Sequence, residues 1–559
     1  MSEIAPALGG TVSARIDHAF PSLTPTQVAR LAVHGRARPI HRGEVLVEPG
    51  DRAIPFFVVT HGHVEIVRPS AAGEELVVTH GPGGFTGEAA LLAGRPSLVR
   101  ARASEAGEVI ELDRETLLSL MRTDVELGEI LLRAFILRRV ELVARGIGDT
   151  VLLGSEHCAG TLRVKEFLTR NGHPYAYVDL DRDEGVEELL AQFHVAAADV
   201  PVLIWRGEVV LRNPGNQEIA ARLGFNEAVD PAHLRDVVIV GGGPAGLAAA
   251  VYGASEGLDV LVLEADSPGG QAGTSSRIEN YLGFPTGISG LDLTGRAYAQ
   301  AQKFGAQVMI ARGAGELVCD RKPFMVVMND GARVPTRTVV IATGAEYRKP
   351  PGPDLARFVG AGVYYAATAM ESQMCRGEEV IVVGGGNSAG QAAVFLAQTS
   401  GRVHMLVRSG GLAASMSRYL VQRIEDNPAI EVRTHAELVA VEGEDHLERV
   451  RWRHNQTGDT GTLDVRHVFV MAGATPNTRW LDGCVALDAK GFIKTGPDLS
   501  PEDLAAARWP LARAPHLLET SLPGVFAVGD VRSGNIKRVA SAVGEGSIAI
   551  AFVHQVLKE

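Results

Sequence analysis

The sequence predicts a multidomain protein with an N-terminal β-barrel and following helices, a small α/β domain, and two larger α/β domains built to bind nucleotides. Three observations lead to this fold class. Short strand-like runs broken by glycine fill the first 125 or so residues, which is typical of an all-β barrel or sandwich. Strand and helix patterns alternate between residues 148 and 228. From residue 235 onward the chain contains two strand–glycine turn–helix–strand units.

Length, charge and the N-terminus limit the class of protein. The chain has 559 residues, which is too long for one hydrophobic core, and a formal net charge of −12. That charge argues against nonspecific binding to nucleic acid or to an anionic membrane. The N-terminal MSEIAPALGG lacks the basic and apolar regions of a signal peptide, and no uninterrupted apolar run approaches the ~18 residues of a spanning helix. We therefore expect a cytoplasmic protein with no membrane segment, nucleic-acid partner or metal site.

The four cysteines, Cys158, Cys319, Cys375 and Cys484, form no Cys-x-x-Cys pair. Four cysteines in a chain of this length do not make a disulfide framework. We therefore expect the thiols to be largely reduced.

The N-terminal barrel is predicted from GEVLVEPGD, FFVVTHGHVEIV and GEELVVTHGPGG, followed by LVRARASEAGEVIELD. A helical stretch follows from about Arg114 to Arg145, with apolar residues three and four positions apart. We place this domain at residues 1–146.

The small α/β domain is placed at residues 147–230. DTVLLGSEHC predicts a strand that runs into a turn, and AGTLRVKEFLTRNG an amphipathic helix that ends at Gly172. YAYVDLD is a second strand, VPVLIWRGEVVLRN a hairpin with its turn at Arg206-Gly207, and QEIAARLGF a last helix.

The first nucleotide unit is DVVIVGGGPAGLAAAVYGASEGLDVLVLEA. Gly241, Gly243 and Gly246 follow an apolar strand and open an alanine-rich helix that includes Ala245. Such glycines allow a tight turn and the close approach of a pyrophosphate to the helix N-terminus. Glu264 ends the next strand, 23 residues after Gly241, where a carboxylate can bind ribose hydroxyls. The full context favours a dinucleotide site over an empty glycine-rich turn.

The second unit is EEVIVVGGGNSAGQAAVFLAQTSGRVHMLVR. Gly384, Gly386 and Ala389 stand where the first unit has Gly241, Gly243 and Gly246. Asn387 and Ser388 lie between Gly386 and Ala389.

The end of the second unit carries Arg408 where an acid would accept from a free 2′-hydroxyl. An arginine there can pair with a 2′-phosphate, which favours NADPH over NADH. Position 409 is serine, so a surface arginine is the competing interpretation.

Residues 235–559 resemble the low-molecular-weight thioredoxin reductases. The matching runs come in order: GGGPAG, GGQAGTSSRIENYLGFP, IATG, GGGNSA, GATPNT and GVFAVGD. The resemblance implies two Rossmann-like domains, for FAD at 235–348 and 479–559 and for NADPH at 349–478, and a homodimer. It also implies FAD contacts that we carry onto these residues: Gly270, Gln271, Asn280, Thr343, Gly344, Gly529, Asp530, Arg538 and Val539.

The sequence departs from this family in YYAATAMESQMC. The family's two redox cysteines align with Ala366 and Ala369, and alanine cannot form a disulfide. Cys375 lies six residues past Ala369. It is either a second redox thiol or a small buried apolar residue.

The 147–230 domain resembles a thioredoxin or glutaredoxin. In SEHCAGTLRVKEFL, Cys158 stands where the family has its first cysteine and Thr161 where it has its second, and Pro201 matches the family's cis-proline. A thiol at a helix N-terminus has a lowered pKa and can attack a disulfide, although another thiol must resolve the product. The alternative is a degenerate domain that serves only for docking.

Residues 41–110 resemble the cyclic-nucleotide-binding fold, a jelly-roll. FTGEAALLAGRPSLVRARA matches its phosphate-binding cassette, in which Gly87 and Glu88 would contact the ribose. Ser97 stands at the position of the phosphate-binding arginine, and Arg95 and Arg100 are displaced from it. We carry Gly87, Glu88 and Arg95 as candidate ligand residues, and expect weak or absent binding of a cyclic nucleotide.

Together these patterns predict an oxidoreductase in which NADPH reduces FAD and the electrons pass to a thiol or disulfide acceptor through Cys158, with Cys375 as a second candidate. Two alternatives remain open. The electrons could leave directly for a ferredoxin, a quinone or oxygen, or the flavin could serve only as a redox sensor with little turnover.

Overall fold

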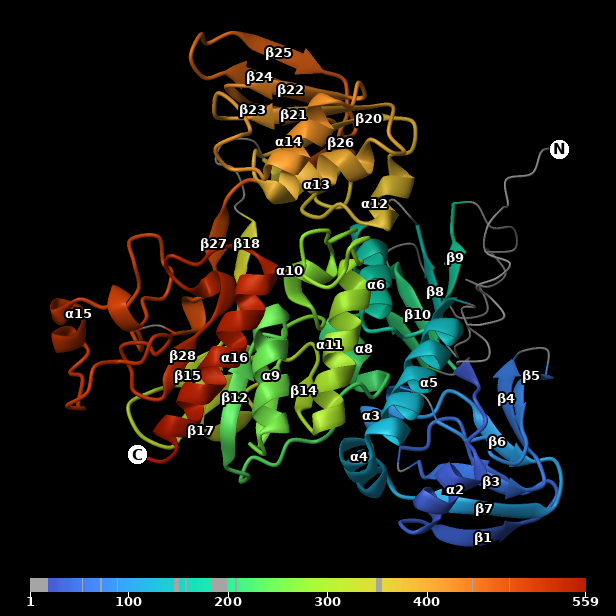
Figure 1. Ribbon diagram of the computed structural model, residues 1–559. Helices are drawn as coiled ribbons and strands as arrows, with labels where there is room; N and C mark the ends of the chain where they lie inside the picture. The colour runs from blue at the N-terminus through green and yellow to red at the C-terminus, as the bar shows by residue number, and fades with distance from the viewer. Residues whose placement is uncertain are drawn as a thin grey trace, which may run out of the picture.

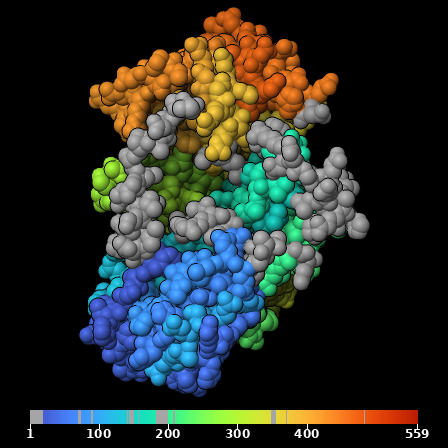
Figure 2. Space-filling model, turned by 90° about the vertical axis from the view of Figure 1, so that its right-hand side faces the viewer, coloured from blue at the N-terminus to red at the C-terminus, as the bar shows by residue number. Residues whose placement is uncertain are grey.

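The structure is a computed structural model that describes residues 19–52, 54–70, 73–87, 89–144, 150–155, 158–181, 199–206, 209–347, 354–444, 446–481 and 483–559. Figure 1 shows the N-terminal barrel at one end, the second nucleotide-binding domain at the other, and the first between them. Figure 2 shows the middle α/β domain on the face between the two ends.

The barrel consists of two antiparallel sheets with strand orders β1-β7-β3 and β2-β6-β4-β5. Buried side chains such as Phe57, Val59 and Val109 fill the space between the sheets. The elements are α2 (Pro25–Ala32), β1 (Arg36–Ile40), β2 (Val45–Val47), β3 (Phe56–His61), β4 (Val64–Ser70), β5 (Gly73–His80), α3 (Ala89–Leu92), β6 (Arg100–Ala103) and β7 (Gly107–Leu112).

The helical stretch expected after the barrel is divided into α4 (Arg114–Thr123) and α5 (Val125–Ala144). The break falls at Asp124, whose Oδ1 accepts a hydrogen bond from the amide of Leu127 at 3.1 Å. An aspartate side chain that caps the next helix in this way competes with continuation of the first. Helix α5 then runs from the barrel toward the middle domain (Figure 1).

The middle domain is a four-stranded sheet with order β11-β10-β8-β9, in which β8 and β9 are parallel and the other pairs antiparallel. Its core is continuous with that of the first nucleotide-binding domain, so the two are packed together. Its elements are β8 (Thr150–Gly154), α6 (Ala159–Arg170), β9 (Ala176–Asp179), β10 (Val202–Trp205), β11 (Val209–Arg212) and α8 (Asn216–Arg222).

The first nucleotide-binding domain has a seven-stranded sheet of order β14-β13-β12-β17-β16-β15, with β28 also pairing with β17. Helix α16 is long and apolar enough by composition to cross a membrane, but it packs on α9 and contributes Ala549, Ile550 and Val553 to the core. The strands are β12 (Arg235–Val240), β13 (Val260–Leu263), β14 (Gln307–Met309), β15 (Ala314–Val318), β16 (Phe324–Met328), β17 (Arg333–Ile341) and β28 (Val525–Ala527). The helices are α9 (Pro244–Ser255), α10 (Gly270–Gly273), α11 (Gly290–Phe304), η3 (Arg479–Leu481), η4 (Gly496–Asp498), α15 (Pro501–Ala506), η5 (Gly529–Val531) and α16 (Val539–Val556).

The second nucleotide-binding domain has a parallel sheet of order β19-β26-β20-β21-β22 and a separate antiparallel sheet, β23-β24-β25. A two-stranded ladder, β18 with β27, lies where the chain enters and leaves this domain. The elements are β18 (Ala345–Tyr347), η2 (Leu355–Phe358), β19 (Val363–Tyr364), α12 (Ala369–Met374), β20 (Glu379–Val383), α13 (Asn387–Leu396), β21 (Arg402–Val407), α14 (Arg418–Glu425), β22 (Ile430–Thr434), β23 (Ala436–Glu442), β24 (Arg449–His454), β25 (Thr460–Leu463), β26 (His467–Val470) and β27 (Ala474–Pro476).

Candidate functional site

The first glycine-rich turn links β12 to α9, and its geometry requires glycine at two positions. Gly241 has a φ of 106°, and a Cβ there would lie 2.3 Å from the carbonyl oxygen of Ala342. A Cβ on Gly246 would lie 1.9 Å from the carbonyl oxygen of Gly241. At Gly243, the N-cap of α9, the nearest atom to a Cβ would be Gly270 Cα at 3.9 Å. The first amides of α9 therefore have room in front of them for a pyrophosphate.

Glu264 lies just past β13 and is almost fully buried beside this turn. Its Oε2 accepts a hydrogen bond from the amide of Gly242 at 2.6 Å, and its Oε1 accepts one from the amide of Asp266 at 2.9 Å. Burial raises the pKa of Glu264, while the two amide bonds and the charge of Arg170 act in the opposite direction. The carboxyl group is thus fixed where the sequence pattern predicted an acceptor for ribose hydroxyls.

Residues 269–271 close over the same turn. The amide of Gly269 donates to the carbonyl of Gly242 at 2.8 Å, and Gln271 Nε2 donates to the carbonyl of Ala345 at 2.5 Å. The structure therefore brings Gly270 and Gln271 to the predicted FAD turn. Asn280 is exposed in the loop beyond α10, so its role toward FAD stays a prediction.

Thr343 and Gly344 follow β17 at the edge of the same space. Thr343 Oγ1 donates to the carbonyl of Asn477 at 2.9 Å, and Asn477 Nδ2 donates back to the carbonyl of Thr343 at 3.0 Å. Gly344 has a φ of 64° and no atom within 4 Å of a Cβ position, so its surroundings are open. Asn477 was not predicted as a functional residue, although it belongs to the GATPNT run.

The C-terminal FAD residues lie in η5, which contains Gly529 and Asp530, and at the start of α16. Burial raises the pKa of Asp530, and Lys537 lies 4.0 Å away with its charge acting against that shift. Arg538 is the exposed N-cap of α16, and Val539 is its first residue. A Cβ on Gly546 would lie 2.2 Å from the carbonyl oxygen of Ala245, so α16 packs closely on α9. This packing joins the C-terminal segment to the first glycine turn.

The second glycine turn links β20 to α13. Gly384 has a φ of 141°, and a Cβ there would lie 2.6 Å from the carbonyl oxygen of Met471 and 3.2 Å from the Cβ of Ala389. Gly386 is the N-cap of α13, and the nearest atom to a Cβ on it would be 4.0 Å away. Asn387 Oδ1 accepts from the amide of Ser417 at 2.8 Å, which fixes the loop that faces the turn.

Ser388 and Arg408 are both exposed at this turn. Arg408 immediately follows β21, at the edge where its sheet ends. Its position is compatible with a contact to a 2′-phosphate. Both glycine turns thus fit dinucleotides.

Cys158 is the N-cap of α6 and is partly exposed. The Val200–Pro201 peptide bond is cis, and a Cβ on Gly160 would lie 2.8 Å from Pro201 Cδ, so the proline packs against the first turn of this helix. Arg163 is close enough to Cys158 to interact with it electrostatically. The helix N-terminus and the cis-proline are the surroundings that the sequence predicted for Cys158, whose reactivity stays a prediction.

The Cys158 end of α6 also faces the second nucleotide-binding domain. A Cβ on Gly360 would lie 2.5 Å from the Cβ of Ala159, the residue next to Cys158. Glu166 interacts electrostatically with Glu371 of α12. The middle domain is therefore docked at this edge of the second domain.

Three of the cassette residues that the sequence singled out, Arg95, Ser97 and Arg100, have hydrogen-bond partners within the protein. Arg95 is 6% exposed, and its Nη1 donates to the carbonyl of Asn171 in the middle domain at 3.0 Å. Ser97 Oγ donates to the carbonyl of Val99 at 2.8 Å, and Arg100 is paired with Glu48 at 2.9 Å. Gly87 has a φ of 97°, whereas Glu88 lies outside the described residues. Arg95 is thus engaged between domains, so its role toward a ligand stays a prediction.

Comparison with known families gives a match to the pyridine nucleotide-disulphide oxidoreductases over residues 235–546. The chain belongs to this family. A second match, to the cyclic nucleotide-binding domain, covers residues 37–124, which are the two sheets of the barrel and α4.

Several thioredoxin reductases are similar to this pyridine nucleotide-disulphide oxidoreductase. That of Bacillus subtilis is 31% identical over 327 residues, which cover 58% of this chain and 96% of the relative. The NADPH-dependent thioredoxin reductase 3 of Arabidopsis thaliana is 32% identical over 323 residues, covering 56% of this chain and 57% of the relative. The crystal structure of Lactococcus lactis thioredoxin reductase in its FR conformation matches with a TM-score of 0.52 and 27% identity, covering 58% of this chain and all of that one. The chain is thus a thioredoxin-reductase-like oxidoreductase, of a family that uses FAD and NADPH.

Ala366 and Ala369, the positions that the sequence resemblance assigns to the family's dithiol, lie just before α12 and at its start. Cys375 follows α12 and is fully buried. Its Sγ lies 3.7 Å from the carbonyl of Ser372 and 3.6 Å from Ser400 Oγ, and burial raises the pKa of the Cys375 thiol. A buried thiol with a raised pKa is a poor nucleophile, so these surroundings favour a structural Cys375.

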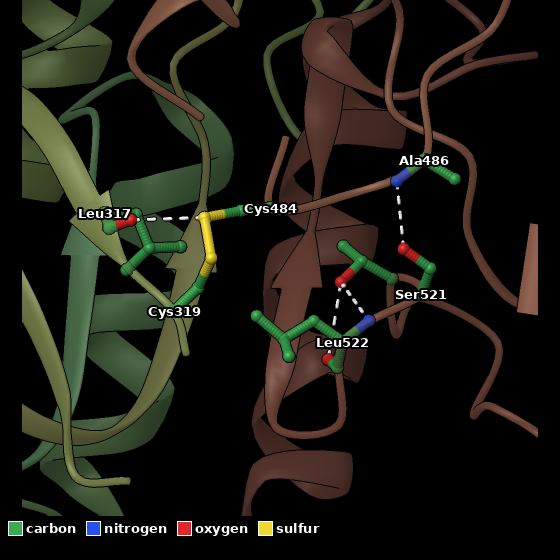
Figure 3. Close-up of a disulfide and its surroundings, with 7 residues drawn as sticks. Leu317, Cys319, Cys484, Ala486, Ser521 and Leu522 are labelled. Atoms are coloured by element: carbon green, nitrogen blue, oxygen red, sulfur yellow. Dashed lines mark hydrogen bonds between the residues drawn. A yellow bond between two sulfur atoms is a disulfide. The ribbon is translucent and has the colours of Figure 1, made fainter. Parts of the chain in front are cut away.

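The expectation that the thiols are largely reduced was wrong for two of the four cysteines. Cys319 and Cys484, which are 165 positions apart in sequence, form a disulfide with their Cα atoms 6.0 Å apart (Figure 3). Cys319 follows β15, Cys484 follows η3, and Cys484 Sγ lies 3.1 Å from the carbonyl oxygen of Leu317. The pairing depends on how the two halves of the first nucleotide-binding domain meet, which no local spacing reveals.

Sequence reasoning also missed Arg170, at the C-terminal end of α6. Its Nη2 donates to the carbonyls of Gly270 and Ser267 at 2.9 Å and 3.2 Å. In the sequence it is an ordinary basic residue in the last turn of an amphipathic helix, which carries no signal for a contact in another domain.

Proposed function

We propose that this protein is an NADPH-dependent flavoenzyme that holds FAD in its first nucleotide-binding domain, NADPH in its second, and reduces a disulfide acceptor through Cys158. The observation that carries the proposal is the placement of Cys158 at the N-terminus of α6, beside the cis Val200–Pro201 bond and at the edge of the second domain. When bound, FAD would accept a hydride from NADPH and pass electrons onward.

The residues of the first domain would bind and orient FAD. The open amides at Gly243 suit its pyrophosphate and Glu264 its ribose hydroxyls. The N-terminus of α16, at Arg538 and Val539, would lie near the flavin ring, where a helix dipole favours negative charge. The second turn at Gly386, with Arg408, would orient NADPH.

Cys158 would act as the nucleophile toward the acceptor. Its thiolate attacks one sulfur of the acceptor disulfide, which forms a mixed disulfide and releases the other sulfur as a thiolate. A further thiol would then attack the Cys158 sulfur of the mixed disulfide and release the second acceptor thiolate. The hydride of NADPH and one solvent proton would supply the two electrons and two protons that return the remaining disulfide to the Cys158 thiol and the further thiol. The thiol of Cys158 is partly exposed, so an acceptor disulfide can reach it.

The test is to reduce the full-length holoenzyme anaerobically with NADPH and then mix it with thioredoxin, ferredoxin, quinone and oxygen in turn. Cys158→Ser should leave reduction of the flavin by NADPH intact and abolish transfer to a disulfide, and Cys375→Ser serves as the matched cysteine control. Disulfide reduction by Cys158→Ser at the parental rate would refute the thiol pathway.

A second candidate function is direct transfer from the flavin to a ferredoxin, a quinone or oxygen. It is favoured by the two alanines that replace the dithiol and by the burial of Cys375. Transfer to one of these acceptors that is unaffected in Cys158→Ser would support it, and slow turnover with every acceptor would instead indicate a redox sensor.

We further propose that the active form is a homodimer through the two nucleotide-binding domains, since this follows from the family. Light scattering at micromolar concentration tests it, and a monomer would refute it.

A further inference from the structure

Helix α6 of the middle domain ends directly on the loop that follows Glu264. Arg170, in its last turn, has a side chain that is only 12% exposed. Besides its bonds to the carbonyls of Gly270 and Ser267, its Nη1 lies 3.3 Å from Asp266 Oδ2 and 3.4 Å from Glu166 Oε1. One guanidinium therefore connects the middle domain to two main-chain oxygens of the predicted FAD loop.

The next residue extends the same contact. Asn171 Nδ2 donates to Ser267 Oγ at 2.9 Å, and Ser267 is fully buried. From α8 of the middle domain, Asn216 Nδ2 donates to Asp266 Oδ1 at 2.6 Å. The middle domain thus holds residues 266–270 through three separate side chains.

This loop in turn borders the space in front of the first glycine turn. The amide of Gly269 is bonded to the carbonyl of Gly242, and Gly270 Cα is the atom nearest to the open side of Gly243. Gly270 has a φ of 52°, a left-handed conformation that glycine adopts readily. Its carbonyl accepts the hydrogen bond from Arg170 Nη2.

We propose that Arg170 is a positioning residue for FAD: it fixes residues 266–270 against the glycine turn, so that the middle domain forms part of the FAD site rather than a freely moving arm. The inference rests on the proposed function, because it requires FAD at Gly243. The inference also concerns the position of Cys158. Because the C-terminal end of α6 is bound to the FAD loop, the thiol at its N-terminal end is held at a fixed place relative to that site.

The test measures the dissociation constant of FAD for the full-length protein, from the rise in FAD fluorescence on release. Arg170→Met should raise the constant about 10- to 100-fold, as expected for losing hydrogen bonds from a charged donor to a loop that contacts the ligand. Arg170→Lys, which keeps the charge and can reach one carbonyl, should recover part of the loss. Arg212→Met is the matched control, because Arg212 pairs with Asp199 inside the middle domain, and it should leave the constant within about twofold.

A second measurement separates positioning from simple loss of stability. Visible circular dichroism of the bound flavin at saturating FAD should change in Arg170→Met and return toward the parental spectrum in Arg170→Lys. A folded Arg170→Met protein with the parental FAD constant and spectrum would overturn the inference and leave the proposed function intact. If Arg170→Met does not fold, a parental FAD constant for Arg170→Lys, which is expected to recover only part of the loss, overturns it. A parental protein that binds no FAD would overturn the proposed function, and this inference with it.

Discussion

Replacing Arg95 by Met should loosen the barrel from the rest of the molecule. Arg95 leaves the cassette of the barrel and inserts between two other domains. Its Nη1 donates to the carbonyl of Asn171 at 3.0 Å, its Nη2 donates to the hydroxyl of Tyr298 in α11 at 3.3 Å, and its guanidinium lies 4.5 Å from the ring centre of Phe225. Methionine keeps much of the apolar stem and removes all three contacts.

The size of the effect follows from these contacts. A hydrogen bond from a charged donor contributes about 1.5–3 kcal/mol and a buried cation–π contact about 2 kcal/mol. The desolvation cost of the buried charge disappears with the guanidinium, which offsets part of the loss. We therefore expect the docking of the barrel to weaken by about 1–3 kcal/mol, which corresponds to roughly a fivefold to hundredfold increase in local opening.

Native-state hydrogen exchange of the full-length protein measures this opening. The amides of Asn171 and His173, which are bonded to the carbonyls of Phe167 and Leu168, report on the helix end that Arg95 contacts. Arg100→Met is the matched control, because Arg100 is paired with Glu48 and Glu74 inside the barrel. Equal exchange at these amides in the parental, Arg95→Met and Arg100→Met proteins would refute the interdomain role of Arg95.

The other predictions concern ligands and the disulfide. Arg408→Ala should raise the KM for NADPH about 10- to 100-fold and leave the KM for NADH nearly unchanged, since a charge-assisted phosphate contact is worth about 1.5–3 kcal/mol. Equal losses in steady-state assays with both coenzymes would contradict the assignment of Arg408 to the 2′-phosphate. Cyclic AMP should bind weakly or not at all in calorimetry, because Arg95 and Arg100 are engaged elsewhere, and a submicromolar Kd would show that one of them takes over the phosphate. Cys484→Ser should lower the free energy of unfolding by about 2–5 kcal/mol, because the disulfide with Cys319 closes a long loop; an unchanged unfolding transition with and without reductant would count against a stabilising bond.

The sequence predicted the elements that depend on local pattern. At Gly241 and Gly246 only glycine fits the turn between strand and helix, and this requirement is visible as a motif because its residues are near one another in the chain. Cys158 at the start of α6 and the cis bond at Pro201 were found in the same way, through a resemblance carried by short runs. The family match over residues 235–546 agrees with the runs that predicted it.

In the helical stretch after the barrel, the spacing of apolar residues predicted the helices but not the boundary between α4 and α5. Apolar spacing continues across Asp124, so periodicity alone predicted one helical stretch, but the side chain of Asp124 caps α5 and ends α4. One side-chain hydrogen bond decided that boundary. The spacing of apolar residues does not show whether an aspartate side chain will bond a main-chain amide and so interrupt a helix.

What the sequence by itself determined is which segments can form nucleotide-binding turns, a barrel and a helix-capping thiol, because each rests on residues within one turn or one strand–helix unit. Only the tertiary structure decided the partners of residues that act across domains. Arg95 was a candidate ligand residue, and its Nη1 donates to the carbonyl of Asn171. Arg170 carried no signal in the sequence, and it donates to the carbonyl of Gly270. Cys319 pairs with Cys484, 165 positions away in sequence. The physical reason is the same in each case: a long side chain or a thiol binds whatever the packing of separate domains brings within about 3 Å, and that packing depends on contacts summed over the whole core rather than on any local run of residues.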